Sequence, residues 1–291
     1  MLKLDKNILI CLLNYTLIST NGFFFYIISN FFILLNQKYY IMDLIRNLEF
    51  IMSIIRIYLE QSLKIGSQII VKGNDFHYLK NVMRVFIGLN INVFNQIDGE
   101  FKAVVSSIDR HEIILIVKSN IRSFKDEYFN DVELILSPIR HARFDFLIEK
   151  ITELGVKIIS PIISDNSSVK NVNVKHISEV IKQAVEQSRR LSLPVLNELV
   201  TFKSKINQFD FKNRTLIYLD ERQNGNNNEL KCLKKYYKKP VSFLIGPEGG
   251  FSSNEFKLLD DNRAISLSLG SRILRSETAG ISIIAIYNLL S

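Results

Sequence analysis

The sequence is poor in the residues from which metal sites and disulfide frameworks are built. Its 291 residues include two cysteines, Cys11 and Cys232, and four histidines, all scattered along the chain. Neither set has the close spacing of a zinc site or the density of a disulfide-linked secreted domain. We therefore expect no bound metal, and a chain that remains in a reducing compartment, the cytoplasm.

Two motifs that bind nucleotide phosphates are also missing. Neither Gly-x-Gly-x-x-Gly nor Gly-x-x-x-x-Gly-Lys-Ser/Thr occurs, so dinucleotides and nucleoside triphosphates are poorly supported as ligands. An acidic balance is absent too, because 37 lysines and arginines outweigh 29 aspartates and glutamates and leave a formal charge of +8. This excess favours a polyanion such as nucleic acid as partner, although a solvated, lysine-rich surface explains it equally well.

Charge is missing altogether between Lys6 and Lys38, where the sequence contains "ILICLLNYTLI" and "GFFFYIISNFFILL". Residues 7–35 are enough to cross a bilayer, but asparagines, serines and a glycine interrupt them where a spanning helix prefers Leu, Ile or Val. We interpret residues 1–51 as an extension from a misassigned start, with a membrane anchor over residues 7–35 or a targeting peptide as alternatives. Ordered sequence is expected from Met52.

Residues 52–123 have the pattern of a small β domain. Strand-like runs flank the pair Asp98-Gly99, which is a strong hairpin signal. Between the first strands, "NDFHYLKNVMRV" predicts a helix capped by Asn74 or Asp75. Its basic residues are spaced by three and four and so share one face, which is either an RNA contact or a solvated surface: His77, Lys80 and Arg84.

From residue 124 the pattern changes to strands that alternate with helices. The expected strands are "VELILSP", "KIISPIIS", "TLIYLD", "VSFLIG" and "AISLSLG". The expected helices are "FDFLIEKITELG", "VKHISEVIKQAVEQSRRLSLP", "ELKCLKKYYKK", "SNEFKLLDDN" and "SETAGISIIAIYNLL". Such alternation is typical of an α/β domain with a mostly parallel sheet and helices on both faces. In these sheets, ligands bind beyond the carboxyl ends of the strands.

Three loops follow the last three strands: "LDERQNGNN", "GPEGGFSS" and "LGSRILRSE". Their glycines let main-chain groups approach a ligand closely, so the loops together predict a cofactor cradle. Alone, "GPEGG" is more typical of a tight turn with proline at its second position. Ser252 and Glu255 have the spacing of a capping box for the next helix.

Arg272 and Arg275 flank a short apolar step in the third loop. If this segment is helical, both side chains project toward the mouth of the sheet, where two guanidiniums suit a phosphate or an oxyanion. Ser276 is expected to cap the last helix, with Glu277 in its first turn. The alternative is that the two arginines form salt bridges with Glu248 or Glu277.

Two more basic stretches have ordinary explanations. "KCLKKYYKKP" favours a solvated helix face over an RNA contact. "EQSRRLSLP" places Glu186, Arg189 and Arg190 at a helix end, where cations suit the helix dipole.

The motifs "GPEGGF", "LGSRILRSETA", "EKITELGV" and "EQSRRLSLP", with "RIYL", "HYLKNVMR" and "DGEF", resemble the RsmE family of 16S ribosomal RNA (uracil-N3)-methyltransferases, of the SPOUT class. The resemblance runs from about Ile55 to the C-terminus. It implies a PUA-like β-barrel over residues 52–123 and a trefoil-knotted, mostly parallel α/β methyltransferase domain over residues 124–291. It also implies S-adenosylmethionine as cofactor, uridine N3 in the small-subunit RNA as target, and a homodimer.

The resemblance also assigns residues to the site. The catalytic candidates are Arg275 and then Arg272, with Glu277 orienting one of them. Glu248 is expected to organise the cradle by pairing with Arg272. The cofactor-binding candidates are Leu219, Gly246, Pro247, Glu248, Gly249, Gly250, Leu267, Leu269, Gly270, Ile273 and Leu274. The candidate RNA contacts are Arg56, His77, Arg84 and Arg189.

The sequence departs from the family pattern in the three loops. Ser271 stands where proline is expected and Ser276 where threonine is expected. "LDER" replaces a His-Pro-Glu-like first loop and leaves the roles of Asp220 and Glu221 open. This altered loop is the observation behind one alternative function, an RNA-binding protein that keeps the fold without catalysis. The other is a membrane-tethered form of the enzyme.

Overall fold

The computed structural model describes residues 55–127, 130–222 and 229–290. The apolar extension over residues 1–51, with the three interpretations attached to it, lies outside these ranges. Within them, no helix combines the length and the apolar character that crossing a bilayer requires.

Five short strands form a first, curled sheet, which we call the small sheet: β1 Arg56–Tyr58, β2 Gln68–Val71, β3 Asn90–Asn95, β4 Gly99–Ile108 and β5 Ile113–Arg122. Their order is β1-β3-β4-β5-β2, with β1 parallel to β3 and the other pairs antiparallel. The predicted hairpin joins β3 to β4. Gly99 has a φ of 98°, and a Cβ there would lie 2.4 Å from the carbonyl oxygen of Arg122, so only glycine fits.

The helix predicted between the first strands is shorter and differently built. Helix α4 spans Gly73–His77 and continues as one π-helical turn, η1, Tyr78–Val82. Asn74 and Asp75 lie inside α4, so the predicted cap is wrong. Arg84 lies beyond η1 with a φ of 50° and therefore does not share a helical face with His77 and Lys80.

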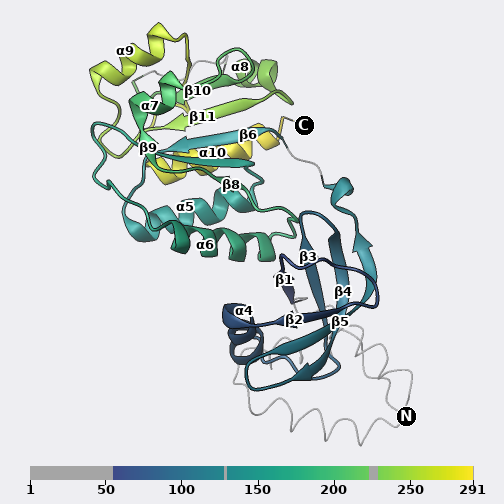
Figure 1. Ribbon diagram of the computed structural model, residues 1–291. Coiled ribbons are helices and arrows are strands. Elements are labelled where there is room, and N and C mark those ends of the chain that lie inside the picture. Colours follow the sequence, from purple (N-terminus) through teal and green to yellow (C-terminus); the bar gives the residue numbers. More distant parts are fainter. Residues whose placement is uncertain (1–54, 128–129, 223–228, 291) are drawn as a thin grey trace, which may run out of the picture. The chain divides into compact units, whose positions relative to one another are not determined.

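Seven strands form the second, large sheet: β6 Val132–Leu136, β7 Ile158–Ile163, β8 Val195–Leu196, β9 Val200–Thr201, β10 Thr215–Leu219, β11 Val241–Ile245 and β12 Ile265–Leu267. Every pair in it is parallel, in the order β12-β10-β11-β6-β7-β8 with β9 beside β7. The helices that accompany it are α5 His141–Glu153, α6 Val174–Gln187, α7 Phe202–Asn207, α8 Glu229–Tyr236, α9 Ser253–Asp261 and α10 Ser276–Asn288, with a 3-10 turn, η2 Phe124–Asp126, before β6. The predicted α/β architecture is confirmed (Figure 1).

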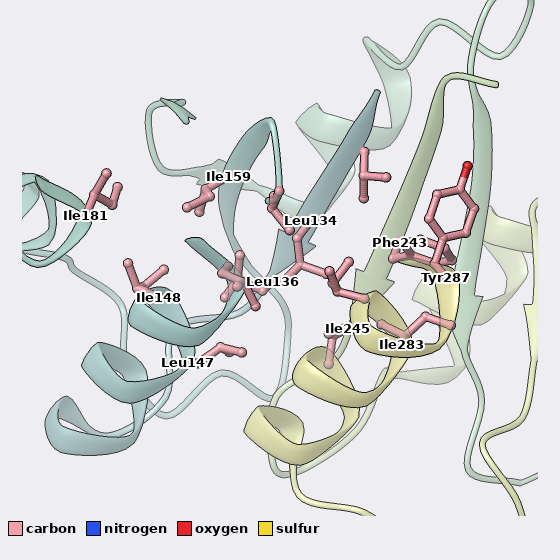
Figure 2. Close-up of a cluster of buried hydrophobic side chains, with 14 of the residues drawn as sticks. Leu134, Leu136, Leu147, Ile148, Ile159, Ile181, Phe243, Ile245, Ile283 and Tyr287 are labelled. Carbon is pink, nitrogen blue, oxygen red and sulfur yellow. The ribbon is translucent and has the colours of Figure 1, made fainter. Parts of the chain in front are cut away.

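Alternate residues of the central strands supply two separate cores. In β6, Leu134 and Leu136 join the core beneath α5, α6 and α10, whereas Ile135 joins the core beneath α7 and α9. Because successive side chains of a strand point to opposite faces, a strand covered on both sides is buried along its whole length, and the one charged side chain of β6, Glu133, is paired with Lys205. Figure 2 shows the first of these cores, where residues of β6, β7 and β11 meet residues of the three helices.

The ends of the helices follow local chemistry. Gly155, with a φ of 87°, follows α5 as predicted. Ser252 and Glu255 form the predicted capping box of α9. Helix α6 stops at Gln187, well before Pro194, because Arg189 adopts a φ of 61°.

The strand order brings three loops to one place. Strand β10 lies between β11 and β12, and all three run in the same direction. The loops that leave their carboxyl ends are therefore neighbours, although β10 and β12 are separated in sequence by β11 and its helices. This is the edge of the sheet where a ligand is expected.

Candidate functional site

A pocket of about 230 Å³ lies at this edge, between the loops that follow β10, β11 and β12. It brings together most of the predicted cofactor-binding residues: Leu219, Gly246, Pro247, Glu248, Gly250, Leu269, Gly270, Ile273 and Leu274. Two predicted residues do not line it. Leu267 is fully buried in the core, and Gly249 faces the side chain of Asn166.

Glycines in the second loop leave space that the side chain of any other residue at the same position would occupy. A Cβ on Gly246 would lie 3.3 Å from the Phe251 ring, and Gly250 has a φ of 67°. The Gly250 amide donates a 3.0 Å hydrogen bond to the Pro247 carbonyl, so Pro247 is the first residue of the turn. The prediction that proline occupies the second position was wrong. Main-chain atoms therefore form this wall of the pocket, and a ligand can approach them closely.

The loop after β7 holds this turn from behind. The Asn166 amide donates 3.1 Å hydrogen bonds to the carbonyl oxygens of both Gly249 and Gly250. Glu255 accepts from the amides of Ser252 and Asp165 at 2.8 and 3.0 Å, so its carboxylate joins the two loops as well as capping α9. Burial raises the pKa of Glu255, against the effect of these two amides.

The start of α10 is tied to the same turn. Ser276 does not cap the helix as predicted, because Arg275 occupies the N-cap position and Ser276 is the first helical residue. The Ser276 hydroxyl donates a 2.9 Å hydrogen bond to the Gly246 carbonyl. The second and third loops are thus joined directly at the pocket.

Arg272 and Arg275 both line the pocket, and both are exposed. We expected the two side chains to project in the same direction if the segment between β12 and α10 were helical. This segment is not helical. Within the described residues, neither forms an ion pair, and the expected pairing with Glu248 or Glu277 is absent. Glu277 does not line the pocket; it is 9% exposed, lies 3.9 Å from Arg143 Nε, and its Oε2 has no hydrogen-bond partner among the described residues.

The first loop, left open by the sequence, has an internal ion pair. Arg222 donates to both carboxylate oxygens of Asp220 at 2.9 and 2.8 Å, and its guanidinium lies 3.4 Å from the centroid of the Phe256 ring. The hydrogen bonds from Arg222 lower the pKa of Asp220. Asp220 is 3% exposed and its charge is paired with that of Arg222. Glu221 is therefore the carboxylate that this loop presents to the pocket without an ion pair among the described residues.

Several residues of the pocket were not predicted: Ile245, Asp220, Glu221, Phe251, Phe256, Ser268, Ser276 and Ala279. Phe251 and Phe256 pack edge to face with 5.6 Å between centroids. Their spacing of five residues around a helix start gives no periodic signal, and their role depends on how α9 folds back beside β10.

The predicted RNA contacts fall into two groups. His77, Arg84 and Arg189 are exposed, as are the lysines of the "KCLKKYYKKP" stretch. Arg56, in contrast, is 8% exposed, and its guanidinium donates to Glu100 at 2.7 Å and to the carbonyls of Val185, Glu186 and Arg190 at 3.1, 2.8 and 3.1 Å. A side chain with its donors used in this way is not available to a phosphate, so Arg56 is corrected to a structural residue.

Arg56 belongs to a buried polar network between β1 and the end of α6. Glu100 also accepts from Arg122 at 2.9 Å, and Tyr58 donates its amide to the Glu186 carboxylate at 3.0 Å. Arg190, 6% exposed, donates to the carbonyls of Thr152 and Val156. Burial lowers the pKa of Arg190 to about 10 and raises the pKa of Glu186 to about 7.

No cluster of three or more histidine, cysteine, aspartate or glutamate side chains that could hold a metal occurs in the ranges that the structure describes. The pocket offers instead apolar walls, main-chain glycines, the carboxylates of Glu221 and Glu248, and two guanidiniums. This donor set fits a nucleoside with charged substituents better than a phosphate ester, because apolar side chains and carboxylates share the lining with the two cations.

Comparison with known proteins agrees with this description. A family model described as RNA methyltransferase domain matches residues 126–288, and one described as RNA methyltransferase PUA domain matches residues 71–118. Ribosomal RNA small subunit methyltransferase E of Rickettsia conorii is 30% identical over 237 residues, which are 81% of this chain and 95% of the relative. The protein of that name from Bacillus subtilis is 26% identical over 72% of this chain and 85% of its own.

Two solved structures have the same fold. One is the methyltransferase E of Neisseria gonorrhoeae bound to S-adenosylmethionine, with 25% identity, a TM-score of 0.73, and coverage of 82% of this chain and 98% of the other. The second is a methyltransferase from Legionella pneumophila in complex with the same cofactor, with 25% identity, a TM-score of 0.72, and coverage of 81% and 98%.

Proposed function

Because this chain belongs to the RsmE family of ribosomal RNA methyltransferases, we propose that it transfers the methyl group of S-adenosylmethionine to N3 of a uridine in 16S ribosomal RNA. The observation that supports this most is the pocket at the ends of β10, β11 and β12. It combines a main-chain cradle with two exposed arginines that form no ion pair within the described residues. Sequence motifs and geometry thus lead to the same three loops.

The proposed domains follow from the same membership. Residues 52–123 form the PUA-like RNA-binding domain and residues 124–291 the SPOUT methyltransferase domain, whose sheet carries the cofactor. The trefoil knot of this class would lie where the chain leaves β12 and returns to α10 past the Gly246 turn. The hydrogen bond from Ser276 to Gly246 fixes that passage.

The cofactor site is proposed to use the residues that line the pocket. Leu219, Leu269 and Leu274 would pack against the adenine, and the Gly246–Gly250 turn would approach it with main-chain atoms. S-adenosylmethionine, when bound, supplies an already activated methyl group. The protein therefore has to hold the uracil and the methyl donor in the orientation that allows transfer.

The chemical step needs the uracil to become a nucleophile at N3. N3–H is a weak acid, so release of its proton to solvent water places negative charge on the uracil oxygens, and a positioned guanidinium lowers the free energy of that anion. We assign this role to Arg275, with Arg272 as second choice. Glu277 would act by positioning the start of α10, since its observed neighbour is Arg143 rather than either of these arginines.

We also propose a homodimer that uses the outer face of α10. The helix from Ser276 to Asn288 has Glu277 as its one charged residue, and Glu277 is buried. The outer face of the helix is therefore uncharged, and Leu289 just beyond it is 82% exposed. A mainly apolar helix whose outer residues are partly exposed fits contact with a second copy.

The substrate is proposed to be 16S ribosomal RNA in the small subunit, in the cytoplasm, where the net charge of +8 favours binding. The test is mass mapping of small-subunit RNA from cells that lack the protein. A lost 3-methyluridine that returns with the wild-type chain, and not with Arg275→Ala, is the expected result. An unchanged modification pattern would contradict the proposal.

The alternative, an RNA-binding protein without catalysis, derives from the altered first loop. In that loop the Asp220 carboxylate is paired with Arg222, whereas the Glu221 carboxylate remains at the pocket. Calorimetry with S-adenosylmethionine separates the two functions, because only the enzyme requires the cofactor to bind.

A further inference from the structure

The loop from residue 82 to residue 88 carries three large apolar side chains that face solvent. Val82, Phe86 and Ile87 are 66%, 59% and 63% exposed. Val85 between them is 7% exposed and packs into the core of the small sheet. Single exposed apolar residues are common on protein surfaces, but three in six positions form a patch that calls for a partner.

Backbone hydrogen bonds hold this loop in place. The Val85 amide donates to the Leu79 carbonyl at 3.0 Å, and the Gly88 amide donates to the Val105 carbonyl at 2.8 Å. The Leu89 amide closes a turn onto the Phe86 carbonyl at 3.1 Å. Phe86 is therefore presented by an ordered backbone, which lowers the entropy lost when a partner binds.

Basic residues flank the patch. Arg84 lies inside the loop and is exposed. Lys80 donates to the Asp109 carbonyl at 3.0 Å, which brings the exposed Arg110 in the β4–β5 turn to the same end of the small sheet. The β4–β5 turn has two acidic residues: Glu112 is paired with Lys72 at 3.0 Å, and Asp109 is exposed, so Lys80, Arg84 and Arg110 together outnumber the one carboxylate that lacks a basic partner among the described residues.

We propose that the 82–88 loop is a stacking platform for unpaired RNA bases, with Phe86 as its aromatic surface and Arg84 as its phosphate contact. An exposed aromatic ring next to a guanidinium is the combination by which proteins bind single-stranded nucleic acid, because every base has a π-face and every nucleotide a phosphate. Uncharged partners would gain nothing from the cations. The inference rests on the proposed function, which identifies the RNA as 16S ribosomal RNA. It adds the place on the protein where unpaired nucleotides next to the target uridine are bound.

The chain contains no tryptophan, so Phe86→Trp creates a single fluorescent reporter at the platform. We expect a short single-stranded ribo-oligonucleotide, added to the full-length protein, to quench this fluorescence in a saturable manner. Phe86→Ala should weaken the Kd for the same oligonucleotide by about 5- to 100-fold, the range of one lost base stack. Phe86→Trp should keep the wild-type Kd.

The matched control is Ile97→Trp. Ile97 is 79% exposed in the hairpin at the opposite end of β3, and the fluorescence of this variant should not respond to the oligonucleotide. Arg84→Ala should lower the slope of log K against log salt by about 0.7, whereas Phe86→Ala should leave it unchanged. These two variants separate stacking from charge.

Three results would overturn the inference. They are an unchanged Kd for Phe86→Ala, equal quenching of the Ile97→Trp variant, and a Phe86→Trp variant whose fluorescence is already shielded from acrylamide without RNA. The last would show that another part of the chain or a second copy covers the loop. Binding of S-adenosylmethionine, followed by calorimetry, should be the same in all these variants. If wild-type protein fails to methylate RNA while the oligonucleotide still quenches the Phe86→Trp variant, the proposed function fails and the platform stands.

Discussion

Two groups of arginines in this protein have opposite surroundings. Arg56 and Arg190, between the small sheet and α6, are buried, and their guanidiniums donate to a carboxylate and to main-chain carbonyls. Arg272 and Arg275, at the mouth of the pocket, are exposed and form no ion pair within the described ranges. The first pair is satisfied inside the protein, whereas the second has no ion-pair partner in the described ranges and is proposed to face a ligand.

The difference shows how burial and pairing separate structure from function. A buried guanidinium is stable only when acceptors replace the water that it has lost, so each acceptor around Arg56 is part of the fold. A guanidinium at a pocket that has no internal acceptor can stabilise charge that appears during a reaction. Four substitutions test this contrast, in decreasing order of expected effect.

Arg56→Ala should cause the largest loss of stability. It leaves Glu100 buried with the partly exposed Arg122 as its remaining cation, and it strands three carbonyls at the end of α6. We expect the free energy of unfolding, measured with urea, to fall by about 3 to 5 kcal/mol. Arg84→Ala, at an exposed arginine, is the control and should change it by less than about 0.5 kcal/mol. If the two variants lost the same free energy of unfolding, the contrast between buried and exposed arginines would be wrong.

Arg275→Ala should leave the fold intact and remove the chemistry. We expect methyl transfer to small-subunit RNA to fall by about 100- to 1000-fold, the range for losing one group that stabilises an oxyanion. The Kd for S-adenosylmethionine and the urea midpoint should stay near the wild-type values. Arg263→Ala, at an exposed arginine after α9, is the control. Normal transfer by the Arg275 variant would sink its assignment.

The sequence was sufficient for the parts that depend on local patterns. The strands β6 and β11, the glycine after α5 and the Ser252–Glu255 box are confirmed because each is decided by neighbouring residues. Most of the proposed cofactor residues also meet at one pocket, since three parallel strands end there.

The role of single arginines could not be predicted in the same way. "RIYL" gives no sign that Arg56 is buried, because its acceptors at the end of α6 are distant in sequence and come close only when the chain folds. The bond from Ser276 to Gly246 and the clamp by Asn166 are equally long-range. Ser276 fits the pattern of a helix cap, and that local interpretation was wrong because the helix begins one residue earlier, with Arg275 at the N-cap, and the Ser276 hydroxyl donates to the distant Gly246 carbonyl.

Glu186→Gln tests a poorly compensated charge of the buried network. Burial raises the pKa of Glu186 to about 7, with Lys182, Asp75 and Arg56 as the charged groups around it. A raised carboxyl pKa means that the folded state holds its proton more tightly than the unfolded state. The stability that Glu186 contributes is therefore present below about pH 4.5 and lost as pH rises through 7.

Gln keeps an acceptor for the Tyr58 amide but cannot ionise. Urea unfolding of the variant at pH 8 should thus show a gain of about 2 kcal/mol over wild type, which shrinks toward pH 5. Glu179→Gln, at a partly exposed carboxyl nearer the start of α6, should show no such trend. A difference between Glu186→Gln and wild type that does not vary with pH would contradict the assignment.

Asn166→Ala should have the smallest effect and the most local one. Its amide turns the carbonyls of Gly249 and Gly250 toward the loop after β7, so that the turn keeps its shape before the cofactor arrives. Loss of two hydrogen bonds at an exposed site is worth about 1 kcal/mol, or about a five-fold rise in KM for S-adenosylmethionine with little change in kcat. Asn262→Ala removes a comparable amide that donates to Leu258 on α9, away from the pocket, and should leave KM unchanged. If the Asn166 variant lowered kcat instead, the turn would act on the reacting groups and not only on the cofactor.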